Sequence, residues 1–461
     1  MTLDHLEPPV RGSAPVRARR AVGLAGDVAV VIALVWWATS LTWGTGGRQP
    51  HVVSIGLALM AVAALLVRPW RRLPRAVTVA TLAPGVAGFL VCAFAPTGWA
   101  GADAAASWVY AGLMAAVAAG WARDERRRAL LLGVAVLAPL GTFAKGWLAW
   151  WGGGNASQPF VGTFYWHNQE AAFLLMGALC GIAIAVTAAS AVRLLGWLAV
   201  ALSGAGVFLT TSRGAMMALY GALLLLVVIG LATRAWRLSL SALVAGGVAF
   251  VTATVLSGPP FFAHAGGALT GASERAQSGE TLGANSGHRL DDWAQAVHVF
   301  VRWPLTGVGF HGFASGSALV DTNGKGSLTP FAHNGFLQLF VDGGLLLGLA
   351  ALAALAIATV AMGRGLGTAT LSRDWTRVIL ATAVCAAALH SAIDFDWSYP
   401  ALLSGFGLLL VLAAPAAASA PSASRRWNRL LPVVWAVLVV LAVIGAWHGG
   451  LQLNVQVTGA R

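Results

Sequence analysis

Charged side chains are scarce in this sequence. Asp, Glu, Lys and Arg make up 10% of its 461 residues, whereas 58% of the residues are hydrophobic. Soluble domains carry roughly 25% charged residues and about 45 to 50% apolar ones. With a mean hydropathy of +0.76, the chain has too few polar groups to cover a water-exposed surface. The composition therefore excludes an ordinary soluble domain and predicts a protein that crosses a membrane many times.

Cysteine is scarce as well. The three cysteines, Cys92, Cys180 and Cys385, each lie alone inside an apolar run. No pair has the spacing of a metal site or of a disulfide framework, and we expect small core residues. We predict no metal and no cofactor.

Long apolar runs are abundant instead. A run of about 17 to 25 mostly apolar residues is long enough to cross the hydrocarbon core of a bilayer. We count thirteen such runs, near residues 21–43, 51–67, 75–96, 104–121, 129–150, 169–188, 194–211, 214–232, 237–256, 334–361, 376–395, 399–416 and 430–448. The predicted fold class is all-α, a polytopic transmembrane helix bundle of about 12 to 13 spans. The seventh and eighth runs are divided only by "TTSRG".

The basic residues orient these spans. Twenty-one of the 29 Lys and Arg residues fall in alternate segments, namely 1–20, 68–75, 123–128, 193, 234–237, 364–377 and 425–429. By the positive-inside rule these segments are cytoplasmic. We therefore predict a multi-pass protein of the cytoplasmic (inner) membrane, with residues 1–20 as a cytoplasmic tail. The net charge of +13 is explained by topology and anionic lipid, and we expect no nucleic-acid partner.

The same topology divides the chain into segments. Transmembrane helices 1 to 9 occupy residues 21–256, an extracytoplasmic loop occupies 257–333, and helices 10 to 12 occupy 334–416. Residues 417–461 then provide a cytoplasmic linker, an extra span and an outer C-terminal tail. The long loop begins with small polar residues that we expect to be flexible. Its second half, "HRLDDWAQAVHVFVRW", has apolar residues at helical spacing and predicts an amphipathic helix at the membrane interface.

Several polar side chains gather at the predicted extracytoplasmic ends of the spans. They are His167 and Asn168 in "GTFYWHNQEAA", Arg213 in "TTSRGAMMAL", Arg289 in the long loop, His333 and Asn334 in "PFAHNGF", and Asp394 and Asp396 in "HSAIDFDWSYP". Ionisable groups near hydrocarbon are costly and tend to be functional. We expect these side chains to converge on one extracytoplasmic cavity, where the predicted substrate-binding residues are His167, Asn168, Asn334, Asp394 and Asp396.

These motifs resemble the O-antigen ligase and polymerase family of bacterial membrane glycosyltransferases. The resemblance rests on "TSRGA", on "HRLDDW" and "PLTGVGFHGF" in the long loop, on "HNGFLQLFVDGGLLLG" and on "HSAIDFDWSYP", which follow one another in the family's order. It covers the chain from about residue 160 to 415. It implies a polyprenyl-diphosphate-linked glycan donor, such as an undecaprenyl diphosphate glycan, and an acceptor that is a glycan, a lipid or a protein. It also implies that Arg213, Arg289 and His333 are essential.

The chemistry of these residue types fits the same roles. A glycosyl diphosphate develops negative charge as the anomeric bond breaks, and guanidinium groups stabilise it well. We assign this role to Arg213 and Arg289. A histidine suits the removal of a proton from the acceptor hydroxyl, which makes His333 the candidate general base. No outer carboxylate pair has the spacing of a nucleophile and an acid, so single displacement with inversion is preferred.

Structural roles compete with each assignment. Arg213 could anchor a helix end at the head groups. His333 and Asn334 could cap a helix. Asp394 and Asp396 form a D-x-D motif, but two residues are fewer than an oxygen-only metal site usually needs, so structure or acceptor binding is preferred to metal. His167 and Asn168 could line the donor path or form a polar cap.

Two classes of function remain open at this stage. The first is an extracytoplasmic glycan-transferring enzyme, whether ligase, polymerase or protein O-oligosaccharyltransferase. The second is a lipid-glycan transporter. Transporters commonly show internal repeats and ionisable residues near the middle of the membrane. This sequence shows no convincing repeat and places its polar residues at one face, which favours the enzyme.

Overall fold

The structure is a computed structural model that describes residues 16–153, 159–257, 282–321, 330–415 and 425–459. Within these residues the chain is helical with connecting turns and contains no strand, which confirms the all-α class. The α-helices are α1 (Val16–Trp36), α2 (Pro50–Val67), α3 (Arg75–Phe94), α4 (Ala102–Trp121), α5 (Glu125–Gly152), α6 (His167–Thr187), α7 (Ser190–Leu209), α8 (Arg213–Ala232), α9 (Trp236–Ser257), α11 (Leu282–Arg302), α12 (Phe313–Val320), α13 (Gly335–Leu371), α14 (Trp375–Ser391), α15 (Pro400–Ala413) and α16 (Arg425–Gly459). The predicted flexible half of the long loop lies largely at 258–281, outside the described residues.

Eleven of the described helices are long and apolar enough to cross a membrane. The helices α14 and α15, with 17 and 14 residues, are shorter than the predicted runs 376–395 and 399–416. Helix α14 is shorter because residues 392–399 form a turn that belongs to neither helix, and α15 is shorter because it ends at Ala413. A chain in lipid must satisfy its backbone groups internally, and helices do so within one segment. The chain is thus a multi-span membrane protein.

Polar side chains mark where several of these helices begin. The Oδ1 atom of Asn334 accepts a hydrogen bond from the backbone N–H of Leu337 at 3.0 Å, and Ser212 and Asp374 cap α8 and α14 in the same way. Such caps satisfy N–H groups that have no partner within the helix. Because Ser212 starts a new helix, α7 and α8 are separate, as predicted.

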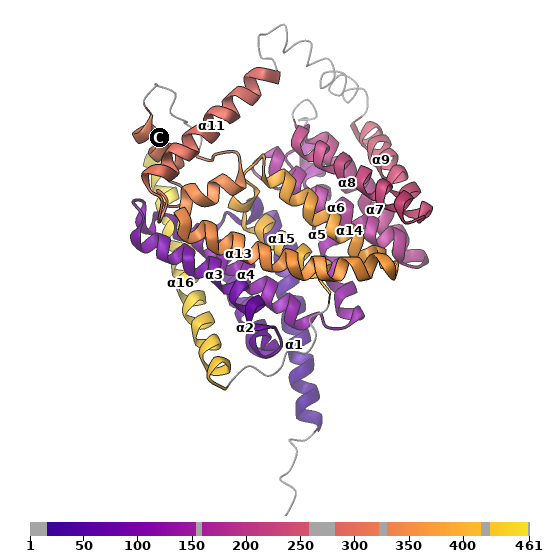
Figure 1. The fold of residues 1–461 in the computed structure, drawn as a ribbon, viewed down its shortest axis with the longest axis horizontal. Coiled ribbons are helices and arrows are strands. Elements are labelled where there is room, and N and C mark those ends of the chain that lie inside the picture. Colours follow the sequence, from indigo (N-terminus) through magenta and orange to yellow (C-terminus); the bar gives the residue numbers. More distant parts are fainter. Residues whose placement is uncertain (1–15, 154–158, 258–281, 322–329, 416–424, 460–461) are drawn as a thin grey trace, which may run out of the picture.

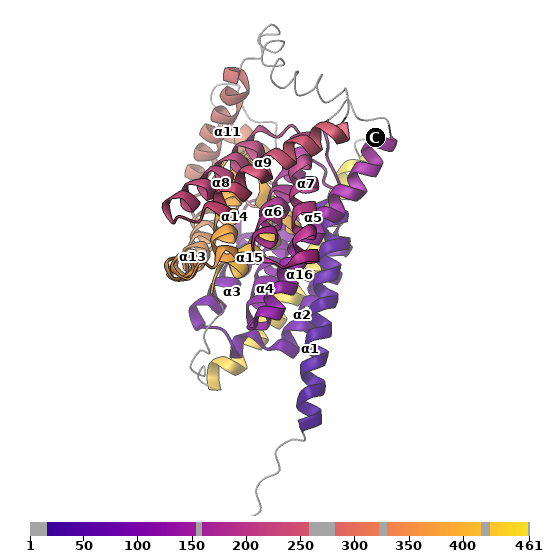
Figure 2. The same ribbon diagram turned by 90° about the vertical axis from the view of Figure 1, so that its right-hand side faces the viewer.

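The helices are arranged around α6, in which 89% of the best spanning window is buried. The helices α5, α7 and α14 pack against α6, while α1, α2, α4 and α16 pack together on another side of the bundle (Figures 1 and 2). The long α13 crosses the bundle at a steep angle to α1 in Figure 1 and is seen nearly end-on in Figure 2. Helix α11 lies at the edge of the bundle, where part of its apolar face, including Val299, is buried.

Helix α13 is broken at Gly344, whose φ of 54° and ψ of −150° lie outside the helical region. The break frees backbone groups that the loop after α11 satisfies. The N–H groups of Leu345 and Leu346 donate to the carbonyl oxygens of Pro304 and Leu305 at 2.8 and 3.1 Å, and Val308 N–H donates to Val341 O at 2.9 Å. A glycine is needed because other residues rarely adopt this backbone conformation.

Candidate functional site

The turn between α14 and α15 carries a buried carboxylate, Asp394, whose side chain is only 2% exposed. Its Oδ2 accepts a hydrogen bond from Asn168 Nδ2 at 2.8 Å. Its Oδ1 accepts from Gln169 Nε2 at 2.9 Å and from the backbone N–H of Phe395 at 2.9 Å. Buried charges are stable only when they are paired and hydrogen-bonded in this way. Asp394 thus joins the start of α6 to the turn before α15.

Two of the predicted catalytic residues flank this carboxylate. The guanidinium of Arg289 lies 3.7 Å from Oδ2 of Asp394 and donates a hydrogen bond to the carbonyl oxygen of Ile393 at 2.8 Å. The Nδ1 atom of His333 lies 3.8 Å from Oδ1 of Asp394. The fold therefore brings together a loop helix, the start of α13 and the turn before α15. Arg289 and Ile393, for example, are 104 residues apart in the sequence.

The surroundings keep Asp394 ionised. Burial raises the pKa of the Asp394 carboxyl, but the imidazoles of His333 and His390 and a backbone N–H lower it by more, so the pKa lies below the ordinary value. Asp396, two residues later, differs. Burial dominates there and raises the pKa of the carboxyl above its ordinary value.

Asp396 belongs to a separate buried pair. Its Oδ2 lies 2.7 Å from Nδ1 of His390 and accepts a hydrogen bond from Ser391 Oγ at 3.0 Å. Asp396 and His390 have side chains that are 2% and 1% exposed. These contacts connect the last turn of α14 to the start of the short 3₁₀ helix Asp396–Ser398 and hold the shape of the Asp394 turn.

Three helix N-termini meet at this turn. Helix α6 reaches it through Asn168 and Gln169. Helix α13 reaches it at Gly335, where an added Cβ would lie 3.0 Å from the carbonyl oxygen of Ser391. Helix α8 reaches it at Gly214, where an added Cβ would lie 2.7 Å from Cδ1 of Ile393. Helix N-termini carry partial positive charge and unpaired N–H groups, so their convergence favours an anion.

Arg213 is the first residue of α8 and therefore lies beside the same turn, with an exposed side chain. A Cβ added at its neighbour Gly214 would lie 2.7 Å from Ile393 and 3.5 Å from His390. The backbone at the start of α8 thus borders the Asp394 turn, whereas the guanidinium of Arg289 reaches this turn from α11.

The backbone of His333 is held in an unusual conformation. Its φ is 49°, in the left-handed region, and its carbonyl oxygen accepts a hydrogen bond from Trp293 Nε1 at 3.3 Å. The preceding N–H, of Ala332, donates to Oε1 of Gln338 at 2.7 Å. Non-glycine residues with positive φ are uncommon, and such strain clusters at functional sites. Asn334 is the N-cap of α13, which agrees with the capping alternative for this residue.

The predicted binding residue His167 is the first residue of α6 and is half-buried. It directly precedes Asn168, which contacts Asp394. The D-x-D motif does not present two free carboxylates, since protein donors engage oxygens of both residues. Among the described residues, no group of three or more His, Cys, Asp and Glu side chains is arranged to hold a metal ion.

One residue near the site was not predicted from the sequence. The guanidinium carbon of Arg48, between α1 and α2, lies 4.9 Å above the ring of Tyr399 and 5.5 Å above the ring of Phe331. The sequence offers a turn signal in "TGGR" but does not reveal the two rings. Gln169 was missed too, although it adjoins Asn168.

A second polar cluster lies behind the His333 loop. His311 Nε2 lies 3.0 Å from Oδ1 of Asp103, and Gln338 Nε2 donates to Asp342 at 2.8 Å. Burial lowers the pKa of His311, but the negative charge of Asp103 raises it by more, so the net pKa is above the ordinary value. These side chains border a cavity of about 30 Å³, large enough for a water molecule.

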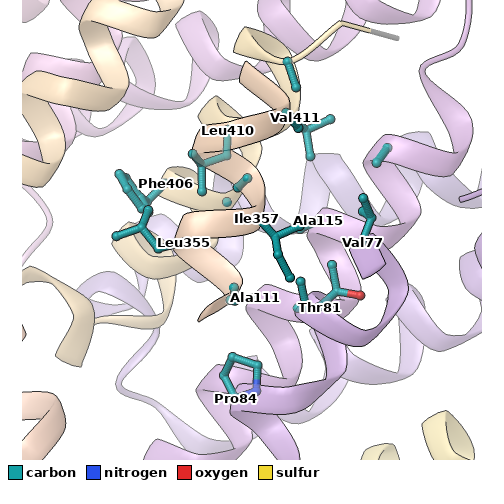
Figure 3. Close-up of a pocket in the computed structure, with 18 of the residues that line it drawn as sticks. Val77, Thr81, Pro84, Ala111, Ala115, Leu355, Ile357, Phe406, Leu410 and Val411 are labelled. Atoms are coloured by element: carbon teal, nitrogen blue, oxygen red, sulfur yellow. The ribbon is translucent and has the colours of Figure 1, made fainter. Parts of the chain in front are cut away.

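A larger apolar cavity of about 570 Å³ lies among α3, α4, α13 and α15. Figure 3 shows Val77 and Thr81 of α3 facing it together with Leu355 of α13 and Val411 of α15. Three of its lining residues, Trp108, Leu339 and Trp397, also line the small polar cavity. The same lining includes Arg128 and Arg364.

Comparison with known proteins identifies one related family. No curated protein matches the chain. Residues 198–353, however, match the model of the family described as O-antigen ligase. This range contains Arg213, Arg289 and His333, while Asp394 follows it. The match agrees with the motifs found in the sequence and supports the assignment of this central region, residues 198–353, to the O-antigen ligase family.

Proposed function

We propose that the protein transfers a glycan from a polyprenyl-diphosphate lipid to an acceptor on the extracytoplasmic side of the membrane. The observation that carries the proposal is that Arg289 and His333 flank one buried carboxylate, Asp394, beside Arg213. The family match supports a membrane glycan ligase or polymerase in general. The donor, the face and the roles below are our inference.

The two arginines would bind the donor. Arg213 and Arg289 reach the Asp394 turn from α8 and α11, and three helix N-termini add partial positive charge there. A diphosphate carries several negative oxygens, which guanidinium groups can bind two at a time. The same groups would stabilise the charge that develops on the leaving diphosphate as the bond from the anomeric carbon breaks.

His333 would accept the proton of the acceptor hydroxyl. Its Nδ1 is buried beside Asp394, so this nitrogen is the one to carry a proton toward the carboxylate, and Nε2 is left to act as the base. The separation of 3.8 Å is longer than a hydrogen bond, but catalytic contacts are often long before substrate binds. As the acceptor oxygen attacks the anomeric carbon, its proton would pass to Nε2 and the polyprenyl diphosphate would leave. One displacement inverts the anomeric centre.

Asp394 would position these groups rather than touch substrate. Both of its oxygens already accept hydrogen bonds, and its side chain is 2% exposed. Asp396 is buried too, but only its Oδ2 is engaged, by His390 and Ser391, while its buried Oδ1 has no hydrogen-bond partner. We propose donor contact for His167 and a structural role for Asn168 and Asn334, whose side chains bond to Asp394 and to the start of α13.

The apolar cavity is suited to the polyprenyl chain of the donor. Its described lining is mostly aliphatic, and burial of apolar surface contributes roughly 25 cal/mol per Å². It begins beside Trp397, one residue beyond Asp396, so a chain lying in it would have its diphosphate end near the Asp394 turn.

The proposal is tested by replacing His333 in purified protein supplied with lipid-linked donor and a panel of acceptors. His333→Ala should lower transfer by about a hundredfold to ten-thousandfold with donor binding nearly intact. Because alanine disfavours the positive φ at this position, His333→Asn is the second variant, since asparagine tolerates that backbone but is not a base.

The matched control is His298→Ala, an exposed histidine on α11, which should transfer at the wild-type rate. Full transfer by folded His333→Asn would eliminate the base assignment. If the wild type instead moves donor across liposomes and transfers nothing to any acceptor, the protein is a transporter.

A further inference from the structure

Arg48 is presented by a turn of unusual shape. Thr45, Gly46 and Gly47 have φ values of 53°, 68° and 87°, all in the left-handed region. A Cβ added at Gly46 would lie 2.6 Å from Cε1 of Phe164 and 2.7 Å from Cδ1 of Tyr399. Only glycine allows the backbone so close to these rings. The turn is therefore pressed against the protein, and the position of Arg48 is fixed.

The guanidinium of Arg48 lies on a rigid aromatic surface. The ring of Tyr399 is completely buried, and the ring of Phe331 stacks on Phe395 with centroids 4.2 Å apart. Burial raises the pKa of the Tyr399 hydroxyl to about 12, so the ring remains neutral. A cation above an aromatic face is stabilised by roughly 0.5 to 1 kcal/mol at an exposed site.

This stacking leaves most of the hydrogen-bond donors of Arg48 available. The side chain is exposed, and it lies close enough to the Tyr399 hydroxyl to lower the pKa of that group. Among the residues that the structure describes, no carboxylate forms an ion pair with Arg48. A guanidinium has five N–H donors around its edge and can bind a carboxylate or a phosphate through two of them. Arg48 is thus a cation without a described counter-ion.

The aromatic rings also connect Arg48 to the proposed base. Arg48 lies 5.5 Å from the ring of Phe331, Phe331 lies 4.2 Å from Phe395, and Phe395 lies 5.2 Å from the ring of His333. The other predicted cation, Arg289, reaches His333 by a different route, through the carboxylate of Asp394. His333 is thus linked to Arg289 through a carboxylate and to Arg48 through two aromatic rings.

We propose that Arg48 binds an anionic group, a phosphate or a carboxylate, on the acceptor. The inference rests on the proposed function, in which Arg213 and Arg289 hold the donor diphosphate and His333 takes a proton from the acceptor. The acceptor must then reach His333 from a side that the diphosphate does not occupy, and we assign to it the side of the Phe331 and Phe395 rings, which carry Arg48. The substrate class that fits is an acidic glycan, whose charged group sits on Arg48 while its hydroxyl meets His333.

The test uses pairs of acceptors that differ in one charge. An oligosaccharide, the same oligosaccharide with one phosphate, and the same oligosaccharide with a uronic acid in place of one hexose are offered with lipid-linked donor. Wild-type protein should prefer the anionic members by roughly tenfold or more in KM, since a charge-assisted hydrogen bond is worth that much. In Arg48→Gln the KM for each anionic acceptor should be close to the KM for the neutral oligosaccharide.

Two further variants test whether the preference depends on the guanidinium of Arg48. Arg48→Lys retains the charge but loses the planar edge, so the preference should fall between that of wild type and Arg48→Gln. Arg237→Gln is the matched control, because Arg237 is also an exposed arginine above an aromatic ring, at 5.7 Å from Trp236. It lies in the first turn of α9, which packs on α7 and α8. It should keep the wild-type preference.

The outcomes separate this inference from the function on which it rests. If Arg48→Gln raises KM for the donor instead of the anionic acceptor, or if its defect appears only in nanodiscs of phosphatidylglycerol and not in phosphatidylcholine, Arg48 binds donor or lipid and the inference is overturned. If wild-type protein transfers to no acceptor, the proposed function fails. Saturation-transfer NMR with the phosphorylated oligosaccharide alone then decides the Arg48 site: binding lost in Arg48→Gln supports it, and equal binding refutes it.

Discussion

Among substitutions near the site that replace a single side-chain atom, Asp394→Asn should reduce the stability of the protein most. The carboxylate accepts three hydrogen bonds of 2.8 to 2.9 Å and has the guanidinium of Arg289 and the imidazole of His333 within 4 Å. In Asp394→Asn one oxygen becomes an NH₂ group, which faces a donor from Asn168 or Gln169. One hydrogen bond is lost, two donors oppose each other, and Arg289 loses its counter-charge. Breaking a buried ionic group in this way costs about 3 to 5 kcal/mol of stability.

The pH dependence of stability provides a second test of the role of Asp394. The pKa of Asp394 is lowered in the folded protein, so its stabilisation is fully present above the unfolded value of about 3.9 and is lost as the pH falls through the folded value. The difference in stability between wild type and Asp394→Asn should therefore be constant near neutral pH and shrink below about pH 4. Thermal melting in detergent, followed across this range, measures it.

Transfer should suffer as well, because Arg289 and His333 would lose the group between them. A displacement of about 1 Å can reduce a rate by about a hundredfold, and we expect a loss of about that size in kcat. Asp374→Asn is the control: this residue caps α14 and pairs with Arg377 at 3.1 Å, and asparagine caps helices as well as aspartate. A melting temperature and transfer rate for Asp394→Asn equal to those of the control would refute the reasoning.

Two further predictions concern the donor. Arg213→Lys keeps the charge but loses the planar fork, so donor KM should rise and kcat should fall, together by roughly ten- to a hundredfold in kcat/KM; unchanged kinetics would leave Arg213 as a head-group anchor. Transfer by purified protein should survive EDTA, because arginines supply the positive charge and the oxygens of Asp394 are already engaged. Loss of transfer in EDTA with rescue by Mg²⁺ or Mn²⁺ would instead place Asp394 and Asp396 at the centre of the mechanism.

The sequence was most informative about the helices. Lipid requires long apolar segments whose backbone is satisfied internally, so hydropathy placed a helix at each predicted run, although only eleven of the described helices are long and apolar enough to cross a membrane. It failed at the end of α14, where the apolar character of Ile393 and Phe395 extends past the last hydrogen-bonded turn, and at the end of α15, which stops at Ala413. Helix termini depend on which backbone groups find partners, and composition does not record that.

The site was only partly predictable. Motifs singled out Arg289, His333 and Asp394 as residue types with useful chemistry, but their meeting depends on how α11, α13 and α14 pack. The contacts of Asp394 with Asn168 and Gln169 cross more than two hundred residues of chain. Arg48 was missed for the same reason, since its partner rings lie near the other end of the sequence. A single sequence carries no signal for such distant pairs.

The break in α13 at Gly344 has a mechanical consequence. Residues 304–308, which follow α11, are hydrogen-bonded into that break, so the end of α11 is tied to α13 at the point where α13 changes direction. Arg289 on α11 and His333 at the head of α13 are therefore linked by backbone hydrogen bonds as well as through the carboxylate of Asp394. A substitution at Gly344 would thus disturb the positions of both residues, although it lies near neither of them in the sequence.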